Sequence, residues 1–206
     1  MSSIANSVAQ GIFRPLDHFR GARDGGSPRA RLEEIRRRAA RLRDEMLAEA
    51  PVAYYRSFDL VRVPYPTRYA LLNAAAVSTP FLHIVNKLIV VQFRSDAGLK
   101  TLLISPSDVR ANKETPFFKR LTRKFGPLRG VGERLLGPVI STVEASLASI
   151  GLAPADVDYI SYDHLHTQDL RRWLGTRDEP AYFPRAKLLV TGQEWASARG
   201  LLPTQA

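Results

Sequence analysis

The sequence predicts an α+β fold, in which one mixed domain of strands and helices follows an N-terminal helical extension. Apolar stretches rich in Ile and Val between residues 82 and 105 predict paired strands. From residue 139 onward, segments with helical spacing alternate with short strand-like segments. A polar arm and one amphipathic helix occupy residues 1–50, and we therefore expect the mixed domain at residues 51–206.

The N-terminal extension begins with a loose arm over residues 1–26 and continues as a helix over residues 28–50. Ser27 is a favourable N-cap residue, and Pro28 suits the first helical position. Apolar residues recur at helical spacing along one stripe, which comprises Leu32, Ile35, Ala39, Leu42 and Met46. We expect this stripe to pack within its own chain, with pairing to another helix as the alternative.

The first half of the domain contains three predicted strands, at residues 52–63, 82–93 and 100–105. A turn at residues 96–98 joins the last two, which predicts a β-hairpin. Residues 70–76 are small and apolar, and they fit either a helix or a buried strand.

The second half of the domain begins with a basic connection at residues 112–132 that is punctuated by Pro and Gly. A helix at residues 139–150 follows, and Gly151 stops it. The remaining predicted elements are a strand at 157–162, a short helix at 169–174, a strand at 187–191 and a last helix at 193–199.

Composition limits the kinds of site and partner. The 206 residues include no cysteine, so a zinc site would have to use His, Asp or Glu. The N-terminus lacks the apolar core of a signal peptide, and polar residues interrupt the apolar segment 81–93. The net charge is +10, but its two clusters, at residues 36–43 and 119–134, lack interleaved aromatic residues. We expect a cytoplasmic protein that contacts no membrane and whose basic clusters are solvated surface, with a nucleic-acid-binding protein as a third, weaker hypothesis.

Candidate functional residues cluster at residues 163–169, with the sequence Asp-His-Leu-His-Thr-Gln-Asp, directly after the last-but-one predicted strand. In an extended chain, residues i and i+2 point to the same side, so His164 and His166 can reach one metal ion. The alternative is a polar loop whose rings cap backbone groups. Asp169 is a candidate third ligand, or else an acidic residue in the first turn of the next helix.

Five further residues have two interpretations each. Asp163 either orients a ligand histidine or caps the helix at 169–174. Asp108 is expected to be a turn residue before a helix, with a polar group near a metal as the alternative. Trp173 and Trp195 are expected to be core anchors and not substrate platforms. His83 is expected to be a satisfied core residue and not a ligand.

A family resemblance adds to these expectations. Residues 151–160, with the sequence Gly-Leu-Ala-Pro-Ala-Asp-Val-Asp-Tyr-Ile, lead into the His-x-His pair, and residues 183–190 precede Gln-Glu-Trp at a helix start. Over about residues 82–200 this pattern resembles the N-terminal half of the metallo-β-lactamase fold, with its lactonase and hydrolase branches the most similar. The resemblance implies a metallo-β-lactamase-like αββα half-sandwich.

The resemblance also implies an activity. In that family the motif is His-x-His-x-Asp-His, and two zinc ions share a hydroxide that attacks a carbonyl or phosphoryl centre. Here His164 and His166 match the first pair, Gln168 replaces the Asp, and Asp169 replaces the last His. The implied protein is a hydrolase of an ester, lactone or similar bond in a small molecule. The implied metal ligands are His164, His166 and Asp169, and Asp169 is also the implied catalytic residue. The implied metal is zinc, as one ion or two, with iron and manganese as alternatives.

The family's later metal ligands lie C-terminal to the region matched here. The sequence is therefore consistent with a fragment of a longer protein, a degenerate member, or a chain that another chain completes, and a homo-oligomer is one expected assembly. A second hypothesis is a non-catalytic binding or assembly module that keeps the fold, which Gln168 favours because a neutral amide is a poor zinc ligand.

Overall fold

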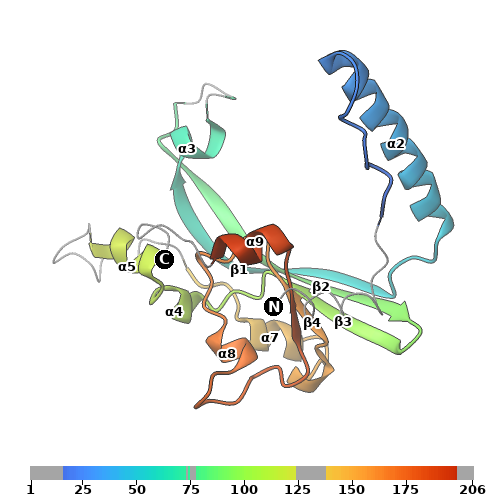
Figure 1. Cartoon of the computed structure of the whole chain (residues 1–206). Helices are drawn as coiled ribbons and strands as arrows, with labels where there is room; N and C mark the ends of the chain where they lie inside the picture. Colours follow the sequence, from blue (N-terminus) through green and yellow to red (C-terminus); the bar gives the residue numbers. More distant parts are fainter. Residues whose placement is uncertain (1–15, 73, 75–77, 124–137, 199–206) are drawn as a thin grey trace. The chain divides into compact units, whose positions relative to one another are not determined.

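The computed structural model describes residues 16–72, 74, 78–123 and 138–198, and its elements are labelled in Figure 1. The chain divides into two compact units, Met1–Val52 and Ala53–Ala206, and each unit is considered by itself.

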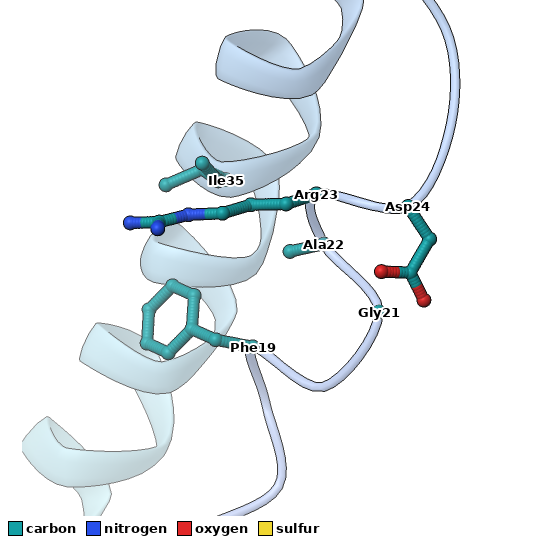
Figure 2. A pocket seen from close by; sticks show the side chains of 6 residues that line it. All are labelled: Phe19, Gly21, Ala22, Arg23, Asp24 and Ile35. Atoms are coloured by element: carbon teal, nitrogen blue, oxygen red, sulfur yellow. The ribbon is translucent and has the colours of Figure 1, made fainter.

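The first unit is a helix with a turn packed on it. Helix α2 spans Pro28–Ala48, and the Ser27 side chain accepts a hydrogen bond from the Ala30 amide, which confirms the predicted cap. Arg38 donates to backbone carbonyls of the preceding turn, and Ala22 of that turn is buried. In Figure 2 the side chains of Phe19 and Arg23 lie over the helix beside Ile35, and all three residues line one pocket.

The apolar stripe of α2 is only partly covered by this turn. Ile35 lines the pocket, whereas Leu32 and Met46 are exposed and no residue of α2 is fully buried. Ile35 and Leu42 are thus partly buried, and the other three members of the stripe are exposed.

The second unit is built on a five-stranded sheet in the order β1-β2-β3-β4-β5. The strands are β1 (Tyr54–Pro66), β2 (Phe81–Ser95), β3 (Gly98–Ile104), β4 (Tyr159–Ser161) and β5 (Lys187–Leu189). The first three pair antiparallel, and β2 and β3 form the predicted hairpin with Ser95 opposite Gly98. Strands β3, β4 and β5 are parallel, so their C-terminal ends lie at the same edge of the sheet.

Short helices connect these strands, which confirms the mixed α+β class. The α-helices of this unit in the described part of the chain are α3 (Thr67–Leu71), α4 (Val109–Asn112), α5 (Pro116–Arg123), α7 (Val143–Ala148), α8 (Arg171–Leu174) and α9 (Gly192–Ala198), and a 3-10 turn spans Pro154–Asp156. None of the described helices has the length and apolar character needed to cross a bilayer.

Three predicted elements differ from the structure. The helix expected at 139–150 begins only at Val143, because Val139 pairs with Val61 of β1 and Thr142 caps the helix. The connection expected at 112–132 contains helix α5, and residues 124–132 lie outside the described residues. The segment at 70–76 belongs to α3 only as far as Leu71, and much of the rest is likewise outside them.

The core lies between one face of the sheet and helices α7 and α8. Its buried members are Leu60, Leu88, Val90, Leu103, Val143, Leu147, Val157, Ile160, Tyr162, Trp173 and Phe183. Trp173 is a core anchor, as predicted. Trp195 is 49% exposed, so that prediction was wrong. His83 is also exposed and not a core residue, because β3 pairs with β2 only from Ile89 onward and leaves the outer part of β2 with β1 alone.

Gly175, which ends α8, cannot be replaced by Ala without cost. It has φ +78° and ψ 174°, a backbone conformation that almost only glycine adopts. An added Cβ would also lie 2.7 Å from the Ala181 amide nitrogen. We expect Gly175→Ala to lower the free energy of unfolding by about 1 to 3 kcal/mol in urea titrations. Gly98 also has a positive φ, but an added Cβ there would meet no atom within 4 Å, so Gly98→Ala should lower the free energy of unfolding by less. Equal losses in the two variants would show that the predicted clash does not occur.

Candidate metal-binding site

The His-rich loop begins directly after β4, at the edge where the parallel strands end. The loop that follows β3 lies beside it, because the Ser105 amide donates to the Ser161 carbonyl at 2.8 Å. The buried Tyr162 hydroxyl then donates to the Pro106 carbonyl at 2.8 Å, and burial raises the pKa of that hydroxyl. Loops at the C-terminal ends of parallel strands are a frequent location of binding sites in open sheets.

His164 and His166 lie side by side in this loop. Their ring centroids are 4.9 Å apart, and the rings are tilted by 37°. The carboxylate of Asp163 lies 3.0 Å from Nδ1 of His164, and the Thr167 hydroxyl lies 3.2 Å from its Nε2. Asp163 therefore contacts a candidate ligand, as the first of its two interpretations predicts.

The environment of His166 favours the neutral imidazole. Partial burial lowers its pKa below the usual value, and the neighbouring His164 lowers it further, while Glu194 and Asp163 act in the opposite direction. A neutral imidazole is the form that binds a metal ion, so His166 is in a suitable protonation state at neutral pH.

Asp169 is engaged elsewhere. Its carboxylate accepts hydrogen bonds from the backbone amide of Arg171 and from the Arg171 guanidinium. These bonds hold the pKa of Asp169 below its ordinary value. Among the described residues, no three His, Asp or Glu side chains form a group that could hold a metal ion. Asp169 lies two residues before the first residue of α8, so it is not an acidic residue of that helix's first turn either, and its observed contact is the ion pair with Arg171.

Gln168 is also held by its neighbours. Its Oε1 accepts hydrogen bonds from the Ser107 hydroxyl at 3.1 Å and from the Asn112 amide at 3.0 Å. The Oδ1 of Asn112 accepts from the Asp169 backbone amide at 2.7 Å. Asn112 is buried and thus ties the end of the His-rich loop to helix α4.

Asp108 is a helix cap, as expected. One carboxylate oxygen accepts from the amides of Arg110 and Ala111 at 3.0 Å each, and the other faces Arg172 at 3.1 Å. Its contacts join α4 to α8 and account for its burial without a metal ion.

Two residues that position the loop were not predicted from the sequence. Asn112 was assigned to a basic connection, and no local pattern marks it. Glu194, in helix α9, accepts a hydrogen bond from the Leu165 amide at 2.7 Å, between the two histidines. A signal for Glu194 exists in the sequence, because Thr191 and Glu194 have the spacing of a helix capping box.

The donor set fits a metal ion in part. Two adjacent imidazoles are the nitrogen ligands that zinc prefers, and one of them is held neutral by its surroundings. Asp169 does not fit as the third ligand, since both of its oxygens face Arg171.

No protein-family model matches the sequence, and no curated protein sequence is similar to it at a significant level. Several solved structures match part of the fold. A probable metal-dependent hydrolase from Staphylococcus aureus is 16% identical with a TM-score of 0.43, and the match covers 73% of this chain and 52% of that one. A quorum-quenching N-acyl homoserine lactone lactonase is 11% identical with a TM-score of 0.39, covering 68% and 58%.

The hydrolase AbOPH of the beta lactamase superfamily is 16% identical with a TM-score of 0.39, covering 76% of this chain and 47% of that one. These three structures are two hydrolases and one lactonase. The chain spans about half the length of the proteins it matches.

Proposed function

We propose that this chain is a metal-dependent hydrolase of the metallo-β-lactamase type, whose metal ion is held by His164 and His166. The observation that carries the proposal is the pair of adjacent imidazoles at the edge where the parallel strands end. A bound zinc, iron or manganese ion would supply a water of lowered pKa for attack on an ester, lactone or similar bond. The substrate would be a small molecule and the location cytoplasmic.

The residues around the pair have distinct proposed roles. Asp163 orients the His164 ring from its Nδ1. The Nε2 of His164 would bind the metal ion, so the Thr167 hydroxyl, which contacts Nε2 at 3.2 Å, would give up that contact when the ion binds. Partial burial keeps His166 neutral and ready to bind. We leave Asp169 out of the ligand set and give it the structural role of holding Arg171 at the start of α8.

Metal content tests the proposal. We expect about one ion per chain, by elemental analysis, in wild-type protein expressed with added zinc. The double variant His164→Ala/His166→Ala should lose it, while His83→Ala should retain it because His83 is exposed on the outer part of β2. In an esterase and lactonase screen, the variants that retain the metal ion should hydrolyse substrate and the double variant should not. Metal-free wild-type protein, or equal metal in the double variant, would overturn the proposal.

The second candidate is a non-catalytic binding or assembly module. The observation that favours it is the engagement of Gln168 by Ser107 and Asn112 and of Asp169 by Arg171, at the positions where the family holds its second ion. Under this hypothesis the wild-type protein binds no metal and the double histidine variant folds with unchanged stability.

A further inference from the structure

We propose that Glu194 is a positioning residue that fixes the His164–His166 pair from helix α9. Its Oε1 accepts a hydrogen bond from the Leu165 amide at 2.7 Å, and Leu165 is the residue between the two histidines. Holding this amide fixes the backbone on both sides of it, and therefore the direction in which each imidazole leaves the loop. The inference rests on the proposed function for its metal-binding consequence, but not for the loop contact itself.

The local geometry of α9 makes this contact unusual. Thr191 caps the helix by accepting from the Glu194 amide at 3.1 Å, which is one half of a capping box. In the complete box, the Glu side chain returns to the amide of the capping residue. Here the Glu194 carboxylate instead reaches a residue 29 positions earlier in the chain. The side chain that would stabilise its own helix is therefore used to hold the His-rich loop.

The other end of the loop is held separately. Asn112 accepts from the Asp169 amide at 2.7 Å and donates to Gln168 at 3.0 Å. Within the loop, the backbone amide of Gln168 donates to the Leu165 carbonyl at 2.9 Å and closes a turn. Leu165 also packs against the core. Asn112 thus secures the C-terminal end, and Glu194 is the side chain that secures the segment carrying the histidines.

Three variants separate the hydrogen bond from the charge. Glu194→Ala removes both, Glu194→Gln keeps an acceptor oxygen for the Leu165 amide, and Gln193→Ala is the control at an exposed position of the same helix turn. In metal-free protein, hydrogen exchange at the Leu165 amide should become about tenfold faster or more in Glu194→Ala, because a hydrogen bond to a charged group is lost. Glu194→Gln should restore most of the protection, and exchange in β3 should not change.

Zinc titration gives the second readout. The affinity should fall by about 10- to 100-fold in Glu194→Ala, as for other residues that orient ligands, and by much less in Glu194→Gln. Unchanged Leu165 exchange in Glu194→Ala would overturn the inference. So would a loss of zinc affinity as large in Glu194→Gln as in Glu194→Ala, because that result assigns Glu194 a direct role through its charge.

The failure of the proposed function has a different signature. If the wild-type protein binds no zinc while Leu165 exchange still responds to Glu194→Ala and is restored by Glu194→Gln, the loop contact stands and the metal site does not. If zinc binds and Leu165 exchange responds, but the affinity is the same in all variants, the loop contact exists and the positioning role is overturned.

Discussion

Replacing Trp173 with Ala is expected to lower the free energy of unfolding by about 3 to 5 kcal/mol, the usual range for removing a fully buried tryptophan. Trp173 is 1% exposed and stacks on Phe183 with ring centroids 5.1 Å apart. Tyr182 contacts the Trp173 ring edge-on, with ring centroids 5.6 Å apart, and the Arg172 guanidinium lies over the Trp173 ring. Ala would leave a cavity between α8 and the segment that carries Tyr182 and Phe183.

The second tryptophan provides a matched control. Trp195 is 49% exposed, so Trp195→Ala should change stability by no more than about 1 kcal/mol. Urea unfolding followed by far-UV circular dichroism compares the two variants without relying on tryptophan fluorescence. Trp173→Phe, which keeps an aromatic ring, should lose less than Trp173→Ala and remains measurable if the Ala variant does not fold. Equal stability of Trp173→Ala and Trp195→Ala would contradict the core assignment.

The two tryptophans also show what the sequence could predict about the fold. Strands and helices with strong apolar periodicity, such as β2, β3 and α2, were predicted close to their observed bounds. The exposure of Trp195 depends on what packs against α9, and the exposure of His83 depends on where β3 stops pairing with β2. Both are long-range properties that neither local periodicity nor residue type contains.

In the candidate site, too, local features could be predicted from the sequence and long-range contacts could not. The His pair and its place after a strand follow from local spacing, and the structure brings the two rings together. The role of Asp169 could not be decided from the sequence, because a carboxylate two residues before an arginine suits either a metal or an ion pair. The contribution of Asn112 was hidden for a similar reason, since its partners lie 56 and 57 residues away.

Asp158→Ala is expected to cost about 3 kcal/mol of unfolding free energy, toward the low end for breaking a buried charge pair. The side chain of Asp158 is 10% exposed, and its carboxylate accepts from the Thr101 amide at 3.0 Å and from Arg185 at 2.7 Å. Lys100 lies 3.3 Å from the same carboxylate. The loss falls at the low end because the Arg185 side chain is 58% exposed and can regain water. Asp158→Asn keeps an acceptor for the Thr101 amide and should lose less.

The contribution of Asp158 to the free energy of unfolding should decrease as the pH falls. Burial opposes its ionisation, but the Thr101 amide, Arg185 and Lys100 outweigh burial and hold its pKa below the ordinary value. A carboxyl whose pKa is lower in the folded state stabilises the protein above its unfolded pKa, about 3.9, and loses that contribution as the pH falls toward the folded value. The gap in unfolding free energy between wild type and Asp158→Asn should therefore be full at neutral pH and narrow below about pH 4.

Urea titrations between neutral pH and about pH 3 measure this gap, with Asp178→Asn as the control at an exposed position. The control should stay close to wild type at every pH. Asp169 also has a lowered pKa, so acid weakens the wild-type protein through more than one carboxyl, and only the difference from Asp158→Asn isolates Asp158. A gap that stayed constant as the pH fell would mean that hydrogen-bond geometry, and not the charge of Asp158, joins β3 and β4 to the Arg185 segment.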